Sequence, residues 1–190
     1  MRVRARQLVL VGVLVLLGVV LVTRVGQADE RTAVATLHNA SGAEVGWARF
    51  EADGDAVHVK VRAYGLTPGF HGFHVHAVGV CEGSVGFATA GGHYNPAGTA
   101  HASHAGDMPS LLAKHDGTAE LDFRTDSFTL DQLLDADGSA VVVHAGPDNF
   151  GNIPSRYLSG PLLTPGPDAT TLATGDSGAR AACGAVAVHG

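Results

Sequence analysis

The stretch Ala56-Val57-His58-Val59-Lys60-Val61-Arg62 decides the fold class of this chain, because a valine stands at every second position and polar residues stand between them. Successive side chains of a strand point to opposite faces, so this alternation is typical of an antiparallel strand with one buried face. Val45 to Glu51 and Ala119 to Arg124 repeat the pattern less cleanly, and Val141 to Val143 and Ala185 to Val188 are short β-branched runs. The pattern therefore predicts an all-β domain.

Turn signals separate these runs. The dipeptides Asp53-Gly54, Asp116-Gly117 and Asp137-Gly138 each stand beside a strand-like stretch, and the whole chain contains 26 glycines and 8 prolines. Only Leu130 to Leu134 looks helical, after a candidate cap at Thr129. Several short strands joined by glycine-rich turns predict a β-sandwich or flattened barrel.

Two segments do not fit this scheme, Cys81 to Ser110 and Asn149 to Arg180. Loops of that length in a compact domain are usually functional or disordered. Seven of the chain's 11 histidines fall between His71 and His115, in or beside the first segment. We therefore expect metal chemistry there.

Charge and composition exclude other classes of protein. The 12 lysines and arginines against 18 acidic residues give a net charge of −6, with no basic run. Phosphate binding needs a clustered positive surface, so we expect no nucleic-acid partner.

The first residues predict export. Residues 1–28 combine an arginine-rich start, an apolar run at residues 8–22 and a small-x-small site at Gly26-Gln27-Ala28, which is typical of a signal peptide. The alternative is an uncleaved N-terminal membrane anchor formed by residues 8–22. Either reading puts residues 29–190, with eight basic against 18 acidic residues and a net charge of −10, outside the cytoplasm. Cys81 and Cys183 then favour a disulfide, with two buried free thiols as the alternative.

The candidate ligands begin with His74 and His76. They lie two positions apart in a strand-like run, so both rings share one strand face about 6.6 Å apart while Phe73 and Val75 face the core. Two imidazoles on the outer face can chelate one metal, although a surface pair without a ligand is the simpler reading of this motif alone.

A second group follows at His93, His101, His104 and Asp107. Three imidazoles and one carboxylate satisfy four-coordinate zinc, and a closed set of this kind would stabilise a loop with little core. His144 ends the Val141 to Val143 run, and Asp148 can accept a ring N–H and fix the tautomer of a ligand.

Four segments, which occur in the family's order along the chain, resemble the copper/zinc superoxide dismutase family. They are Gly72-Phe73-His74-Val75-His76, the glycines before His93, Val143-His144 and Gly178-Ala179-Arg180-Ala181-Ala182-Cys183-Gly184. The resemblance runs from about Thr32 to the C-terminus. His144-Ala145-Gly146-Pro147-Asp148-Asn149 and the long Cys81-to-His93 segment resemble its bacterial exported branch. The family implies an eight-stranded Greek-key flattened β-barrel with two long functional loops.

The resemblance also implies roles for individual residues. It implies a copper site formed by His74, His76, His93 and His144. It implies a zinc site formed by His93, His101, His104 and Asp107, so that His93 is shared by both ions. Asp148 would link His74 to His101, Arg180 would bind the substrate anion, and Cys81 would pair with Cys183. Only two residues separate His101 from His104, a shorter spacing than in the animal enzymes.

The resemblance implies a superoxide dismutase, with Arg180 and His93 as catalytic residues and the superoxide anion as substrate. The alternative is a copper/zinc-binding or chaperone-like domain of the same fold without dismutase activity. A hydrolytic zinc enzyme is disfavoured, because Glu82 is the only glutamate in the ligand-rich stretch and no H-E-x-x-H motif occurs. The expected localisation is secreted, periplasmic or at the cell surface of a bacterium, and a homodimer is left open.

Overall fold

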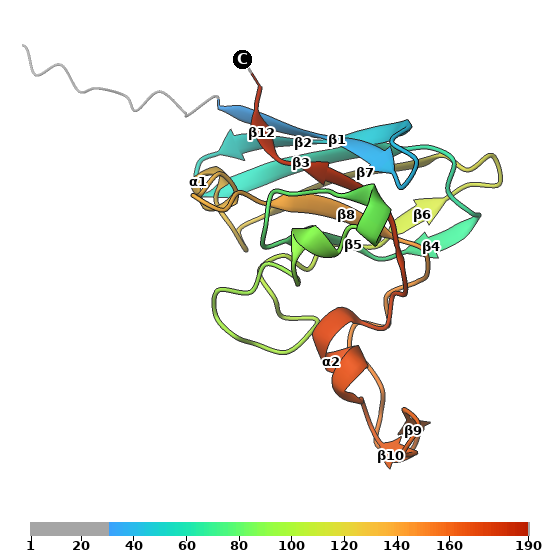
Figure 1. Cartoon of the computed structure of the whole chain (residues 1–190). Coiled ribbons are helices and arrows are strands. Elements are labelled where there is room, and N and C mark those ends of the chain that lie inside the picture. Colours follow the sequence, from blue (N-terminus) through green and yellow to red (C-terminus); the bar gives the residue numbers. More distant parts are fainter. Residues whose placement is uncertain (1–30, 190) are drawn as a thin grey trace, which may run out of the picture.

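A computed structural model describes residues 31–189 as a curled antiparallel sheet with two long loops on one side (Figure 1). Eight strands form the main sheet, in the order β5-β8-β11-β1-β2-β3-β7 with β12 paired to β1. Their bounds are β1 Thr32–Asn39, β2 Glu44–Asp53, β3 Ala56–Ala63, β5 Phe73–His76, β7 Ala119–Thr125, β8 Ala140–His144, β11 Arg180–Ala185 and β12 Ala187–Val188. The all-β class is confirmed, and the order places β8 between β5 and β11, which are not its neighbours in sequence.

A second ladder continues the curl of the sheet. β4 (Gly69–His71) pairs with β6 (Leu111–Ala113), and β6 in turn contacts β7. Only Gly72 separates β4 from β5, and its N–H donates to the Gly146 carbonyl at 2.8 Å. The β4–β6 pair thereby links the two edges of the main sheet. The curled sheet forms a half-barrel, which agrees with the predicted flattened barrel.

The alternating stretch forms β3 as its sequence predicts. Val57, Val59 and Val61 are buried in the core, while the residues between them lie on the other face. The turn into this strand uses Gly54 at φ 63°, a left-handed conformation that glycine adopts without steric cost.

The remaining predicted elements are present with shifted bounds. α1 spans Leu130–Leu133, and the Thr129 side chain and Gln132 form a reciprocal capping box at its start. The predicted strand at residues 185–188 is divided into β11 and β12, because the N–H of Val186 between them donates to Ser139 rather than to β1.

Both long loops contain regular structure. The first contains two 3₁₀ turns, η1 (Gly83–Val85) and η2 (Ala88–Ala90), and the Cys81–Cys183 disulfide joins it to β11. The second contains a short hairpin, β9 (Leu158–Ser159) with β10 (Thr164–Pro165), and the helix α2 (Ala169–Thr174). The sequence predicted the disulfide and both loops but not these inner elements.

The predicted leader, residues 1–28, lies outside the described residues. Within residues 31–189, no helix combines the length and apolar character that crossing a bilayer requires.

Candidate metal centre

His74 and His76 lie on β5 with their rings on one face, as their spacing predicts. Phe73 and Val75 on the opposite face belong to the hydrophobic core. The histidine face is not exposed, however: His74 is 0% and His76 1% accessible, because the loops cover it. A covered pair of imidazoles needs partners, unlike a solvated pair at the surface.

The first loop runs along the free edge of β5. His93 forms an isolated β-bridge with His76, and Asp107 forms one with His74. Two backbone hydrogen bonds of Val75 reinforce this contact. The Tyr94 N–H donates to the Val75 carbonyl, and the Val75 N–H donates to the Gly106 carbonyl. Backbone pairing therefore brings loop ligands against the strand ligands.

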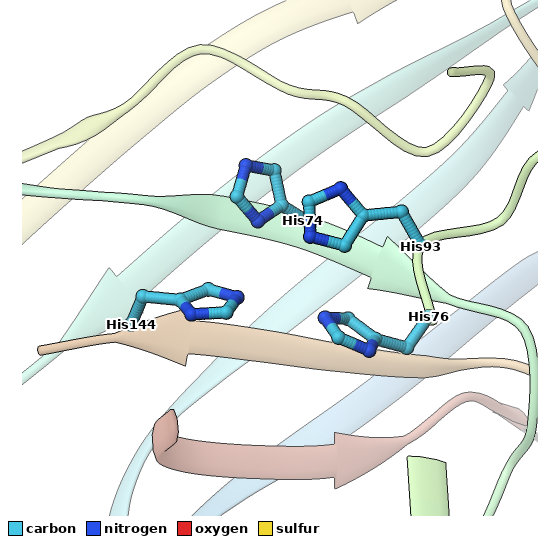
Figure 2. Close-up of side chains that lie close together, drawn as sticks. All are labelled: His74, His76, His93 and His144. Atoms are coloured by element: carbon cyan, nitrogen blue, oxygen red, sulfur yellow. The ribbon is translucent and has the colours of Figure 1, made fainter. Parts of the chain in front are cut away.

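Four histidines converge at this position (Figure 2). His144 comes from the end of β8, which pairs with β5, and its N–H donates to the Gly72 carbonyl at 2.8 Å. One ring nitrogen from each of His74, His76, His93 and His144 lies within 4.8 Å of the others, and all four residues are buried.

The hydrogen bonds of these rings divide their nitrogens into two kinds. His74 Nε2 donates to Asp148 at 2.7 Å, His76 Nδ1 to the Gly91 carbonyl at 2.9 Å and His144 Nδ1 to the Gly178 carbonyl at 3.1 Å. The opposite nitrogens, His74 Nδ1, His76 Nε2, His93 Nε2 and His144 Nε2, are buried without a hydrogen-bond partner among the described residues. Unpaired buried acceptors with the outer nitrogens held in place are what a metal ion requires, so these residues fit copper.

Burial keeps the rings of His74, His76 and His144 neutral. It lowers the pKa of His76 to about 2 and that of His144 to about 3, and it also lowers the pKa of His74. A neutral imidazole retains the lone pair that binds a metal, so the site is prepared for a cation at physiological pH.

A second cluster adjoins the first through His93. Its Nδ1 lies 2.9 Å from Asp107 Oδ1, while His101 Nδ1 lies 3.1 Å from Asp107 Oδ2 and has no hydrogen-bond partner. Ligand atoms of His74, His93, His101 and Asp107 all lie within 4.8 Å of one another. His104 is not in that set, although its Nδ1 lies 3.3 Å from both His93 Nδ1 and Asp107 Oδ1. His93 thus has one nitrogen toward each cluster.

The second cluster carries negative charge. Burial alone would raise the pKa of Asp107, but its close contacts with His101 and His93 outweigh burial and lower it. Burial likewise lowers the pKa of His101, yet Asp107 and Asp148 outweigh it and raise the value to about 9. Without a metal, His101 therefore carries a proton beside the two carboxylates, and a bound cation can take the place of that positive charge.

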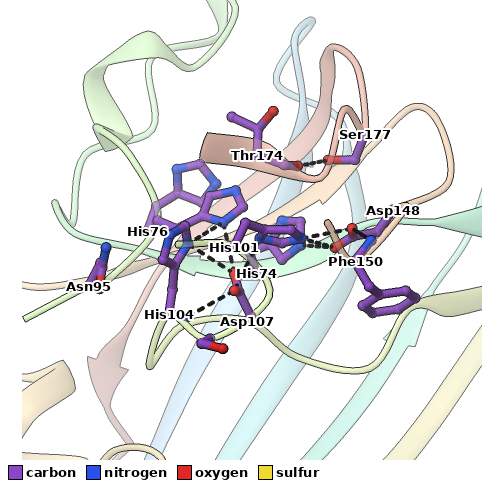
Figure 3. A network of polar contacts seen from close by, with 12 residues as sticks. His74, His76, Asn95, His101, His104, Asp107, Asp148, Phe150, Thr174 and Ser177 are labelled. Atoms are coloured by element: carbon purple, nitrogen blue, oxygen red, sulfur yellow. Dashed lines mark hydrogen bonds and ion pairs between the residues drawn. The ribbon is translucent and has the colours of Figure 1, made fainter. Parts of the chain in front are cut away.

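Asp148 connects the two clusters (Figure 3). Its carboxylate accepts from His74 Nε2 at 2.7 Å and from His101 Nε2 at 2.8 Å, and the Phe150 N–H donates to it at 2.7 Å. Three donors hold this buried carboxylate ionised and fix the orientation of one ring in each cluster.

Gly175 is a contributor that sequence reasoning missed. It ends α2 at φ 62°, and a Cβ at this position would lie 1.9 Å from Asp148 Oδ1 and 2.4 Å from His101 Nε2. A glycine after a short run capped by Asp168 signals the end of a helix, but its contact with Asp148 is visible only in the tertiary structure.

Arg180 begins β11 opposite His144. Its guanidinium donates to the Phe87 carbonyl and to the Gly91 carbonyl, the same oxygen that holds His76. The side chain lines a surface cavity of about 540 Å³ with Gly178 and Gly92. A permanent cation beside the histidine cluster, open to solvent, can receive a small anion.

Comparisons with known proteins agree with this geometry. The model of the copper/zinc superoxide dismutase family matches residues 44–186. Cu-Zn superoxide dismutases of Mycobacterium bovis and Mycobacterium tuberculosis are each 44% identical over 164 residues, covering 80% of this chain and 68% of the relative. An extracellular Cu-Zn superoxide dismutase of Brugia pahangi is 34% identical over 163 residues, which cover 83% of this chain and 76% of that relative.

Solved structures with the same fold include a double mutant of a SOD-like protein from Bacillus subtilis, with TM-score 0.64 and 30% identity over 80% of this chain and 95% of that one. The clock protein EA4 matches with TM-score 0.66 and 27% identity, over 83% of this chain and 94% of that one. With a family model that covers most of the described residues, and with both histidine clusters assembled, the chain belongs to the copper/zinc superoxide dismutase family.

Proposed function

We propose that this superoxide dismutase holds its copper at His74, His76, His93 and His144, and its zinc at His93, His101, His104 and Asp107. The observation that carries the proposal is a set of buried ring nitrogens without hydrogen-bond partners among the described residues, four in the four-histidine cluster and one, His101 Nδ1, in the second cluster. Imidazole suits both copper and zinc, and a carboxylate oxygen completes a zinc set.

When bound, copper accepts an electron from one superoxide and returns it to a second, whereas zinc keeps one oxidation state. Two superoxide anions and two protons thereby give oxygen and hydrogen peroxide. His93 would hold copper through Nε2, and it would carry one of those protons on the same nitrogen only when copper does not occupy it. Its Nδ1 lies 2.9 Å from Asp107 Oδ1, a contact that would keep the ring oriented.

Arg180 binds the substrate anion in this proposal. Two carbonyl acceptors fix its guanidinium, so little side-chain entropy is lost when an anion arrives. Arg156 is the only other lysine or arginine between Asn149 and Arg180, and residues 29–190 are strongly acidic. The local field of Arg180 and of the bound metal ions must therefore draw in the substrate anion without help from long-range attraction.

We also propose that residues 1–28 are a signal peptide or membrane anchor and that residues 29–190 act outside the cytoplasm as a homodimer. The Cys81–Cys183 disulfide supports an oxidising compartment, and the Brugia pahangi relative is named extracellular. Detecting the processed N-terminus by mass spectrometry of the exported protein separates a signal from an anchor.

Replacement of His144 tests the copper assignment. We expect His144→Ala to abolish superoxide turnover while zinc remains bound, because His144 belongs to the four-histidine cluster and not to the second cluster. His115→Ala, outside both clusters, serves as the control and should retain activity and both metals. Full activity in His144→Ala would refute the assignment. A fully metal-loaded wild type without turnover would instead favour the metal-binding alternative.

A further inference from the structure

Phe87 combines a buried aromatic ring with a backbone conformation that few side chains tolerate. It lies between the two 3₁₀ turns of the first loop and has φ 60° and ψ 22°, in the left-handed region. This region brings Cβ close to a carbonyl oxygen, so residues other than glycine are uncommon there. Such a conformation persists only where the surrounding structure enforces it, and it is often found at functional sites.

Packing holds the ring of Phe87 in place. The residue is 1% accessible and is the largest member of the second hydrophobic cluster, which we call the small core. The small core consists of Phe87, Ala90, Ala140, Val142 and Cys183, with Cys81 packed against it. Because the other members are small, the phenyl ring supplies the largest share of the apolar surface. The ring can leave this position only by exposing the small core to water.

The peptide groups around Phe87 are also held by hydrogen bonds. Its N–H donates to the Glu82 carbonyl at 2.9 Å, and its carbonyl accepts from the Ala90 N–H at 3.1 Å. The same carbonyl accepts from Arg180 Nη1. The direction of a carbonyl follows from the φ and ψ of its own residue, so a move out of the left-handed region would turn this oxygen away from the guanidinium.

The disulfide alone does not determine where this oxygen points. Cys81 precedes Phe87 by several positions, and Gly83 and Gly86 lie between them. Glycine adopts many backbone conformations, so a bond at Cys81 fixes the start of the loop without fixing the peptide at Phe87. The ring of Phe87 is an anchor at that peptide itself.

The ring does not line the cavity that receives the anion. Its neighbours Gly86 and Ala88 line the cavity beside Arg180. Phe87 instead lines a separate hollow of about 730 Å³, which also borders the disulfide. An effect of the ring on the substrate must therefore pass through the backbone carbonyl.

We propose that Phe87 is a positioning residue for the substrate anion. Burial of its ring holds the left-handed backbone, this backbone directs the carbonyl toward Arg180 Nη1, and the Gly91 carbonyl holds Nη2. Two fixed acceptors on separate nitrogens orient the plane of the guanidinium and leave its remaining N–H groups for the anion. The inference rests on the proposed role of Arg180, and it adds a side chain that lies outside the anion cavity.

Azide affinity tests the role of the ring. Azide is a small anion whose binding to Cu(II) gives an absorption band, so titrating the copper- and zinc-loaded enzyme measures anion binding separately from turnover. Phe87→Leu should weaken azide binding by roughly 2- to 10-fold, the usual contribution of one hydrogen bond. The matched control is Phe128→Leu, because Phe128 is also 1% accessible but belongs to the main core. It should lower the melting temperature and leave azide affinity unchanged.

A double-mutant cycle tests whether Phe87 acts through Arg180. Arg180→Ala should weaken azide binding, and Phe87→Leu should have no further effect in that background, because the guanidinium that it positions is gone. An equal effect of Phe87→Leu with and without Arg180 would overturn the inference. Phe87→Met has an unbranched side chain that adapts to an irregular gap, and it replaces Phe87→Leu in the cycle if that variant does not fold.

The outcomes separate this inference from the proposed function. Wild-type azide affinity in Phe87→Leu, together with weaker binding in Arg180→Ala, would overturn the positioning role and leave Arg180 as the anion site. Wild-type affinity in both variants would overturn the role of Arg180 and the inference with it. If Phe128→Leu weakens azide binding as much as Phe87→Leu does, reduced stability is the cause and the positioning role is wrong.

Discussion

Gly175 has no functional atom, yet its missing side chain determines how closely α2 can approach the metal-site histidines. The Asn149 N–H donates to its carbonyl at 2.9 Å, and the His101 N–H donates to the Leu172 carbonyl at the same distance. The helix end is thus bonded to both sides of the Asp148–His101 contact. A methyl group at Gly175 must displace either that carboxylate or that ring.

Gly175→Ala should weaken zinc binding by roughly 10- to 100-fold, the usual effect of disturbing a group that orients a ligand. Gly54→Ala is the matched control, because Gly54 has nearly the same φ, 63° against 62°, and no atom within 4 Å of a Cβ. Zinc competition with a chromophoric chelator measures both variants. If Gly175→Ala and Gly54→Ala bind zinc with equal affinity, the contact of the new methyl group with Asp148 has no part in zinc binding, and the prediction is wrong.

Arg180→Ala should slow turnover strongly while copper content stays constant, since the guanidinium binds carbonyls and no ring nitrogen of the cluster. Pulse radiolysis and metal analysis on the same sample check this expectation. Arg180→Lys retains the charge but loses the paired hydrogen-bond geometry of the guanidinium, so its turnover rate should lie between those of the wild type and Arg180→Ala. Copper loss equal to the activity loss would contradict the role in anion binding.

Among the elements, the first loop depends on its covalent link to β11. Cys183 is buried with Phe87 and Ala90 in a small cluster beside the main sheet, and Cys81 packs against it. The loop places Phe87 and Gly91, whose carbonyls hold Arg180. A stable anchor for this loop therefore supports the anion site as well as the fold.

Reduction of the Cys81–Cys183 disulfide should lower the melting temperature. Closing a loop of 102 positions stabilises a chain by up to about 4.7 kcal/mol in the chain-entropy model. Calorimetry with and without reductant measures the change. The Cys81→Ser/Cys183→Ser variant should start at the lower value and show no response to reductant. An unchanged melting temperature in the wild type would contradict the expected contribution.

At the scale of the whole molecule, the fold encloses several imidazoles that ionise freely in the unfolded chain. The unfolded histidine pKa is near 6.5, whereas His76 and His144 have values of about 2 and about 3 in the folded protein. At pH values between the folded and the unfolded pKa, the unfolded state binds more protons than the folded state does. Acid therefore destabilises the metal-free fold. His101, with a pKa of about 9, acts in the opposite direction.

The metal-free protein should be most stable near pH 6.5. Below that pH, His76 and His144 together should cost about 3 kcal/mol per pH unit as an upper figure. From pH 6.5 to 9, loss of the His101 proton should lower the free energy of unfolding again. Denaturant titrations across pH measure both limbs. His144→Ala should flatten the acid limb by about half, and an unchanged acid slope would count against the burial effect.

The sequence alone determined the features that local periodicity and capping encode. The alternation at residues 56–62 predicted β3, Thr129 predicted the start of α1, and the two-residue spacing of His74 and His76 placed both rings on one face. These properties depend on neighbours within a few residues, so they can be derived from the chain before it folds. The ligand sets came from family resemblance and stay proposals.

Only the tertiary structure decided how distant residues meet. It covered the His74 and His76 face with loops, placed His93 between two clusters and brought Asp148 to both His74 and His101. It also built α2 and the β9–β10 hairpin in a segment whose pattern predicted only a loop. Burial and pairing across tens of residues depend on the packed sheet, which no local pattern encodes.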